Sequence, residues 1–322
     1  MINSLLNMYL KCGSIDEAES IFNKMKSRNV VSWNNMIEGY AHNGYGKKAI
    51  EIFKEMENQM IKPNSTTFIN LLKACSANGL ANEALYYLNI MNQYEVIPDI
   101  IHYNDVIDAL GRAGYIEEAE NVIKTMKQQN IVTWENLLQG CYLNNDVERG
   151  ESAAENALKL APQNASIYMT LANIYSVAQR WDDVTKIMLK MKENNIKIIL
   201  GNSWIEINGT VHSFFANDKS HQHWNDIQTE LKRLHNKMRA SGYISNTNFF
   251  VHDITDQNDN PLCSYSEKLA VVLGLISTPS GQPLFVVKDQ NLCPDCHYAI
   301  KIFSKFCNRK ITIRYANYFH HF

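Results

Sequence analysis

The residues of this sequence whose types and spacing are best suited to chemistry lie near its C-terminal end. Cys293 and Cys296 are separated by two residues, and Glu267 lies on the predicted helix that precedes them. Two thiolates at this spacing can bind a zinc ion. A carboxylate beside a zinc-bound water can carry the proton of that water to a substrate. Glu267 is therefore the candidate catalytic residue, and Cys293 and Cys296 are candidate zinc ligands.

The ligand set of this candidate site is incomplete. Zinc enzymes that act on nucleobases hold the metal with two Cys and with a His two residues before the catalytic Glu. Tyr265 stands at that position, and a phenol with a pKa of about 10 is a poor zinc ligand near neutral pH. Two thiolates fall short of the usual three protein ligands. Cys263 as a substitute ligand and a cysteine pair without metal are both open alternatives.

The elements that must position these residues follow from the hydrophobic spacing. Residues 264–276 and 298–306 are predicted to form helices, and residues 283–288 and 310–315 are predicted to form strands. Alternating helices and strands indicate a small α/β domain. A long helix is predicted at 225–239. His221, His223 and Trp224 precede it and are interpreted as structural residues.

The N-terminal part of the sequence is repetitive. Gly13, Gly44, Gly79 and Gly114 are separated by 31, 35 and 35 residues, and alanine, methionine and aromatic residues recur in the same register. Residues 33–42 and 47–58 carry apolar residues at helical spacing. One helix pair cannot bury its apolar face alone, but stacked pairs bury their faces jointly. The predicted fold class is mainly α, an α-solenoid of helix-turn-helix repeats followed by a small α/β domain.

The overall composition excludes several classes of protein. The 322 residues have a formal net charge of −2, and 45% of them are hydrophobic. A membrane span needs a run of about 18 apolar residues, and the sequence contains none. Seven cysteines, an odd number, speak against a disulfide framework. A protein that binds nucleic acid mainly through phosphates is usually basic, so base edges would have to contribute here.

Several motifs resemble one known family. The segment from Val30 to Asn64 closely resembles the pentatricopeptide repeat, and the mixture of 31- and 35-residue spacings resembles the plant PLS subclass. The C-terminal region, with Glu267, Cys293, Cys296 and the ending Phe319-His320-His321-Phe322, resembles the DYW cytidine-deaminase domain. The resemblance implies repeats at 1–130, two degenerate E-type repeats at 131–200, a linking box and helix at 201–242, and a degenerate, truncated deaminase-like domain at 243–322.

In this family the fifth and last residues of a repeat together read one RNA base. Carried over by resemblance, the RNA-binding pairs are Asn3 with Asn29, Asn34 with Asn64, and Asn104 with Asn130. The remaining repeat offers Ile69 with Asp99, and the apolar residue cannot read a base edge. An Asn amide has a donor and an acceptor and can match a pyrimidine. We expect each Asn to face one exposed base, on a target of pyrimidine, pyrimidine, any base, pyrimidine. The alternative is that these Asn residues only start helices.

The resemblance implies sequence-specific binding of single-stranded RNA in organelle RNA processing, and in particular cytidine-to-uridine RNA editing. Tyr265 implies that catalysis by the chain itself is impaired, so that protein partners would supply the activity. The alternatives are an active zinc-dependent cytidine deaminase that acts on RNA and a protein-binding helical-repeat scaffold. Zinc is the implied cofactor, and a second metal site would use His297, His320 and His321.

The family also implies a location and a larger chain. Its members act in mitochondria or chloroplasts, without a membrane or DNA partner. A transit peptide is not present in this chain, and Met1 opens directly into a repeat pattern. We therefore expect further repeats before Met1.

Overall fold

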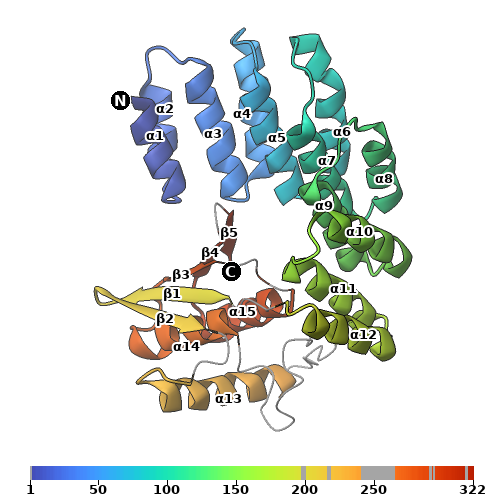
Figure 1. Cartoon of the computed structure of the whole chain (residues 1–322). Helices are drawn as coiled ribbons and strands as arrows, with labels where there is room; N and C mark the ends of the chain where they lie inside the picture. The colour runs from blue at the N-terminus through green and yellow to red at the C-terminus, as the bar shows by residue number, and fades with distance from the viewer. Residues whose placement is uncertain are drawn as a thin grey trace. The chain divides into compact units, whose positions relative to one another are not determined.

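The computed structural model describes residues 2–196, 201–215, 219–240, 265–289, 292, 294–315 and 318–322 (Figure 1). The chain divides into two compact units, Met1–Lys197 and Ile198–Phe322. The helices of the first unit are α1 (Ile2–Lys11), α2 (Ile15–Lys24), α3 (Val30–His42), α4 (Gly46–Asn58), α5 (Ser65–Ala77), α6 (Ala81–Ile90), the short 3₁₀ helix η1 (Met91–Tyr94), α7 (Ile100–Ala113), α8 (Ile116–Thr125), α9 (Ile131–Asn144), α10 (Val147–Leu160), α11 (Ala165–Val177) and α12 (Trp181–Glu193).

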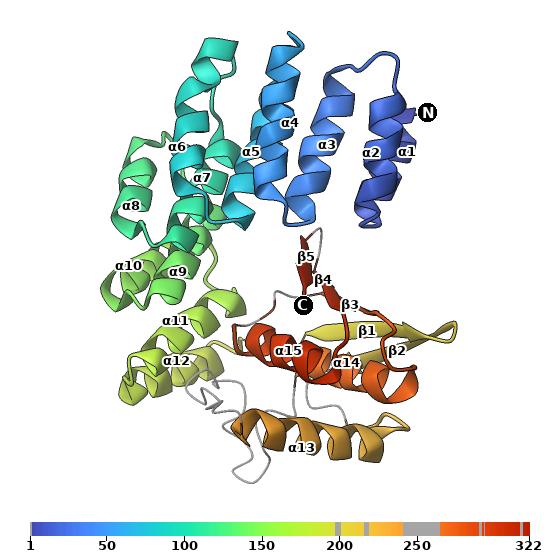
Figure 2. The ribbon, with the colours of Figure 1, turned by 180° about the vertical axis from the view of Figure 1, so that it is seen from behind.

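The first unit is a stack of helix pairs. The first helices of successive repeats, α1, α3, α5, α7 and α9, pack on one another in chain order, and each also packs on the second helix of its own repeat. Figure 2 shows these pairs from behind. The helices predicted at 33–42 and 47–58 lie within α3 and α4. The predicted α-solenoid is confirmed.

Small residues at a fixed position of the second helices allow this close packing. Ala18, Ala49, Ala84 and Ala119 are all fully buried. The aromatic residues Trp33 and Phe68 of the first helices are also fully enclosed, as expected for core residues. Burial of such side chains contributes about 1.5–3 kcal/mol each. The repeating pattern therefore marks the core that holds neighbouring pairs together.

A ladder of amide hydrogen bonds joins successive first helices. Asn35 donates from Nδ2 to the backbone oxygen of Asn3 over 3.0 Å, and Asn70 donates in the same way to Asn34 over 3.1 Å. Asn136 repeats the contact to the backbone oxygen of Asn104 over 2.8 Å. The three acceptors, Asn3, Asn34 and Asn104, are predicted base-reading residues. The ladder therefore fixes the backbone of these residues in the preceding repeat.

Asp105 occupies the matching position in α7, where α3, α5 and α9 have Asn. Its Oδ2 is enclosed and has no hydrogen-bond partner among the described residues. Burial raises the pKa of Asp105 to about 7, and the carboxylates of Asp108 and Asp99 add to this, whereas Lys73 opposes it. An ionised carboxylate cannot donate a hydrogen bond as an amide does. Above neutral pH, Asp105 therefore cannot donate the hydrogen bond that Asn makes at this position in the ladder.

The second unit contains one mixed sheet and three helices in its described part. Its elements are β1 (Asn202–Ile207), β2 (Thr210–Phe215), α13 (Trp224–Ala240), α14 (Ser266–Ser277), β3 (Leu284–Lys288), α15 (Pro294–Cys307), β4 (Ile311–Tyr315) and β5 (Tyr318–His321). The strand order is β2-β1-β3-β4-β5. β3 and β4 are parallel, and the other neighbouring strands are antiparallel. The helix α15 makes the crossover that a parallel pair requires.

The linking box is a hairpin of this same sheet. Asn208 and Gly209 both have positive φ and form the two-residue turn between β1 and β2, as such turns require. β1 pairs directly with β3. The segment predicted as a separate linker at 201–242 therefore shares a sheet with the deaminase-like segment. The finer domain borders at 130, 200 and 242 remain a prediction.

One face of the sheet carries the core of the second unit. Ile205, Phe214, Val286 and Ile313 point to this face and are buried, and α14 packs on β1, β2 and β3. α13 packs in turn on α14. None of the helices in the described part of the chain is long and apolar enough to cross a membrane.

We predict that Asp105→Asn stabilises the chain and that the gain grows as the pH rises from 4 to 8. The folded-state pKa of about 7 lies above the value of about 3.9 for an unfolded chain. Stability is therefore lost as Asp105 ionises with rising pH. We expect a gain of roughly 1–3 kcal/mol at pH 8, measured by urea unfolding at several pH values.

The reverse exchange, Asn70→Asp, provides the matched control. It removes a ladder donor that is 6% exposed, so it should destabilise the chain more at pH 8 than at pH 5. Equal effects of Asp105→Asn at all pH values would contradict the role given to its ionisation.

Candidate nucleic-acid interface and metal site

The three predicted Asn pairs are each joined by a hydrogen bond. Asn3 donates from Nδ2 to Oδ1 of Asn29 over 3.4 Å, and Asn34 donates to Asn64 over 3.1 Å. Asn104 donates to Asn130 over 3.2 Å. The fold thus brings together residues 26 to 30 positions apart in the sequence. We call each of these an amide pair.

Each amide pair lies at the N-terminal end of the first helix of the following repeat. Asn29, Asn64 and Asn130 are the N-cap residues of α3, α5 and α9, and each accepts a hydrogen bond from the third backbone N–H of its helix. A hydroxyl at this third position completes the arrangement. Thr67 donates from Oγ1 to Oδ1 of Asn34 over 2.6 Å, and Ser32 and Thr133 make the same contact to Asn3 and Asn104. The helix-start role belongs to the last residue of each repeat, whereas Asn34 and Asn104 lie inside their helices.

The two residues of a pair differ in exposure. Asn34 and Asn104 are each only 6% exposed, contrary to the expectation that they stand open to a base. Asn64 is exposed, and its Nδ2 donates to no group in the described part of the chain. Asn34 uses one Nδ2 contact and one Oδ1 contact, so one hydrogen and one lone pair remain. A base that approaches this pair meets Asn64 first.

Exposed apolar side chains lie in the first turns of α3, α7 and α9. Val31, Ile101 and Val132 are 41–47% exposed, and each is the second residue of its first helix. Flat apolar or aromatic surfaces are what the faces of unstacked bases contact. These three residues are not among the site residues predicted from the sequence. The available signal was a β-branched residue in the first helical turn that lies outside the buried stripe.

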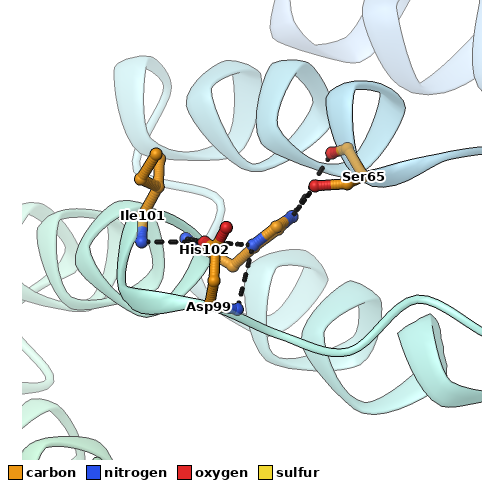
Figure 3. Close-up of polar contacts among 4 residues, drawn as sticks. All are labelled: Ser65, Asp99, Ile101 and His102. Carbon is orange, nitrogen blue, oxygen red and sulfur yellow. Dashed lines mark hydrogen bonds and ion pairs between the residues drawn. The ribbon is translucent and has the colours of Figure 1, made fainter. Parts of the chain in front are cut away.

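The repeat with Ile69 and Asp99 is built differently (Figure 3). Asp99 caps α7 with its Oδ1, which accepts from the backbone N–H groups of Ile101 and His102 and lies 2.7 Å from Nδ1 of His102. The fully buried His102 ring replaces the hydroxyl of the other repeats, and its Nε2 lies 3.3 Å from the backbone oxygen of Ser65. With Ile69 in the preceding helix, no amide pair forms here. The exposed side chain is the Asp99 carboxylate.

The candidate catalytic residue Glu267 lies in the first turn of α14 and is 1% exposed. Its Oε2 accepts a hydrogen bond from Nζ of Lys288 over 2.6 Å. Burial alone would raise the pKa of Glu267, but the Lys288 ammonium, a hydrogen bond with Cys296 and a backbone N–H together hold that pKa below its usual value. Glu267 is therefore a carboxylate at neutral pH. Lys288 was missed in the sequence, because lysines are almost never buried without a partner and their sequence context gives no sign of it.

The described residues do not fit a catalytic zinc site. Cys296 is buried beside Glu267, as expected for a ligand, but Cys293 and Cys263 lie outside the described residues. Tyr265 takes the place of the His ligand, and the Lys268 ammonium lies 5.0 Å from the centre of its ring. Within the described ranges, no three His, Cys, Asp or Glu side chains are grouped to hold a metal ion.

The histidines proposed for a second metal site are only partly brought together. The His297 ring lies 5.5 Å from that of His320 and 4.7 Å from that of Phe322, between centroids. Side chains alternate along β5, so His321 lies on the other side, stacked on Phe319 at 6.2 Å. Burial lowers the pKa of both His297 and His321. His297 and His320 are neighbours, and His321 is apart from them.

Models of known families match most of the chain. The DYW family of nucleic acid deaminases matches residues 242–322, and the E motif matches residues 144–206. The PPR repeat family matches residues 28–77, and the PPR repeat matches residues 1–30 and 101–131. The four matches follow the order that the sequence motifs indicate.

Curated relatives carry the same architecture. A pentatricopeptide repeat-containing protein of Arabidopsis thaliana is 45% identical over 99% of this chain and 54% of its own length. Two others from that plant, one named chloroplastic and one mitochondrial, are 38% and 37% identical over 99% of this chain and over 38% and 51% of their own lengths. The chain spans about half the length of such relatives or less.

A solved structure supports the fold. The crystal structure of the pentatricopeptide repeat protein PPR10 from maize has a TM-score of 0.52 and 17% identity, and the alignment covers 95% of this chain and 44% of that one. At this identity the likeness concerns the fold alone. The repeat, E-motif and DYW matches, with the 45% identical relative, show that the chain belongs to the pentatricopeptide repeat proteins of the PLS class, with an E motif and a DYW deaminase domain.

Proposed function

We propose that this chain binds single-stranded, pyrimidine-rich RNA and serves as a reading factor in cytidine-to-uridine editing of organelle transcripts. The observation that carries the proposal is the recurrence of the amide pair, with the same cap and the same hydroxyl, in three repeats. Relatives named chloroplastic and mitochondrial support an organelle. PPR10 is also known from a crystal structure in complex with an 18-nt RNA element, which agrees with RNA as the ligand.

The chemistry of an amide pair suits a pyrimidine edge. The outward Nδ2 of Asn64 can donate to the N3 acceptor of cytosine, and the unused contacts of Asn34 lie behind it. Val31 or Ile101 supplies an apolar surface for the base face. The Ile69 and Asp99 repeat lacks the pair, so the proposed target keeps the form pyrimidine, pyrimidine, any base, pyrimidine.

We also propose that the chain contributes little deaminase chemistry of its own and that protein partners supply it. Tyr265 cannot replace an imidazole ligand near neutral pH. The carboxylate of Glu267 is already paired with Lys288. Zinc at Cys293 and Cys296, and at His297, His320 and His321, stays part of the family-based prediction.

We predict that Asn64→Asp changes the preferred base at one position from cytosine to uracil and leaves the fold intact. All contacts that Asn64 makes with its side chain use Oδ1 as the acceptor, and a carboxylate preserves them. Only the outward donor is lost, and a carboxylate accepts from N3–H of uracil instead. We expect a change of about 10-fold in the affinity ratio of matched RNA oligonucleotides, measured by fluorescence anisotropy.

The control is Asn121→Asp, which adds the same charge on the exposed surface of a second helix. It should lower affinity slightly for all oligonucleotides without changing the base preference. Selection of purine-rich RNA by the unmodified chain, or an unchanged preference in Asn64→Asp, would show that the amide pairs do not read bases.

We predict that the purified chain holds well below one zinc per molecule and does not convert a cytidine-containing RNA. Tyr265→His restores an imidazole ligand and should raise the bound zinc, measured by elemental mass spectrometry. Tyr265→Phe is the matched variant, because it keeps the ring and adds no ligand. Stoichiometric zinc with turnover in the unmodified chain would instead support the alternative of an active deaminase.

A further inference from the structure

The buried Glu267–Lys288 ion pair is the feature of the second unit that the proposed function leaves unexplained. Glu267 is 1% exposed and Lys288 is 7% exposed. The ammonium of Lys288 lies 2.6 Å from Oε2 of Glu267 and 3.3 Å from Oγ of Ser266. Oγ of Ser266 in turn lies 2.9 Å from Oγ of Ser203. The ion pair is therefore part of a connected polar cluster at the N-terminal end of α14.

The strand register explains how a lysine reaches this place. Ser203 of β1 is the direct neighbour of Lys288 in β3, and both side chains point to the covered face of the sheet. The small Ser203 leaves room for the Lys288 chain. Glu267 approaches from the first turn of α14, where the helix dipole favours a negative charge. Cys296 comes from the first turn of α15 and hydrogen-bonds to the same carboxylate.

A buried carboxylate stays ionised only where a cation or hydrogen-bond donors stabilise it, because an unpaired charge is strongly disfavoured in the interior. In a zinc site the metal and its bound water would provide that stabilisation beside the Glu. Here the Lys288 ammonium already does so. The Lys288 ammonium would repel a second cation at Oε2 of Glu267, because the two charges would be close together in a low-dielectric interior. Tyr265, with the Lys268 ammonium on its ring face, adds no anionic ligand in compensation.

We infer that Lys288 takes the charge-balancing place of a metal ion beside Glu267, so that the C-terminal unit keeps its fold without bound zinc. The inference rests on the proposed loss of deaminase chemistry and names its structural basis. It is independent of how the repeats read RNA. In this arrangement Glu267 and Lys288 stabilise the junction of α14 with β1 and β3.

The test uses the full chain and follows backbone hydrogen exchange of α14 by mass spectrometry, with and without prior treatment with EDTA. We expect the exchange of α14 to be the same before and after chelation. Lys288→Met leaves a buried carboxylate unpaired and should speed the exchange of α14 on the order of 100-fold. The double variant Lys288→Met with Glu267→Gln removes both charges and should recover most of the protection.

Lys301→Met is the matched control, because Lys301 is an exposed lysine of α15, and it should leave α14 unchanged. Loss of α14 protection on chelation would overturn the inference. So would an unchanged α14 in Lys288→Met, or a double variant no better protected than the single one. RNA affinity measured on the same samples separates the two proposals, since a failure of RNA binding leaves the exchange pattern untouched.

Discussion

The side-chain oxygen that caps each first helix is the point on which the repeat array depends. Oδ1 of Asn64 accepts from the backbone N–H of Thr67, from the Thr67 hydroxyl and from Nδ2 of Asn34. One atom thus begins a helix, joins two repeats and orients the outward amide. Because these contacts exist in the chain without RNA, the edge that we propose to read bases is preorganised, and less ordering would be needed on binding.

This arrangement also limits what each repeat can present. The outer amide can be exchanged for a carboxylate without loss of the cap, as Asp99 shows at the start of α7. In the repeat whose inner residue is the apolar Ile69, the residue at the third helical position differs as well, and Nε2 of His102 lies near the backbone oxygen of Ser65. Two separate differences from the other repeats, Ile69 and His102, therefore form one local structure.

The second unit obeys a different constraint, the balance of charge in a closed interior. Two helix N-termini, those of α14 and α15, converge on Glu267 and Cys296. Such termini favour anions, and the lysine from β3 supplies the matching cation. The segment matches the DYW deaminase family in sequence, while the groups in contact with the Glu267 carboxylate include the cation of an ion pair.

The sequence by itself determined the repeats, the helices near α3 and α4, and the strands β3 and β4. Those features depend on local periodicity and on caps a few residues away, which a sequence states directly. Tertiary structure alone decided the burial of Asn34, the partner of Glu267, the separation of His321 from His297 and the place of the 201–209 segment in the sheet. Each of these is set by a neighbour distant along the chain, and neither the spacing nor the type of the residue encodes which neighbour that is.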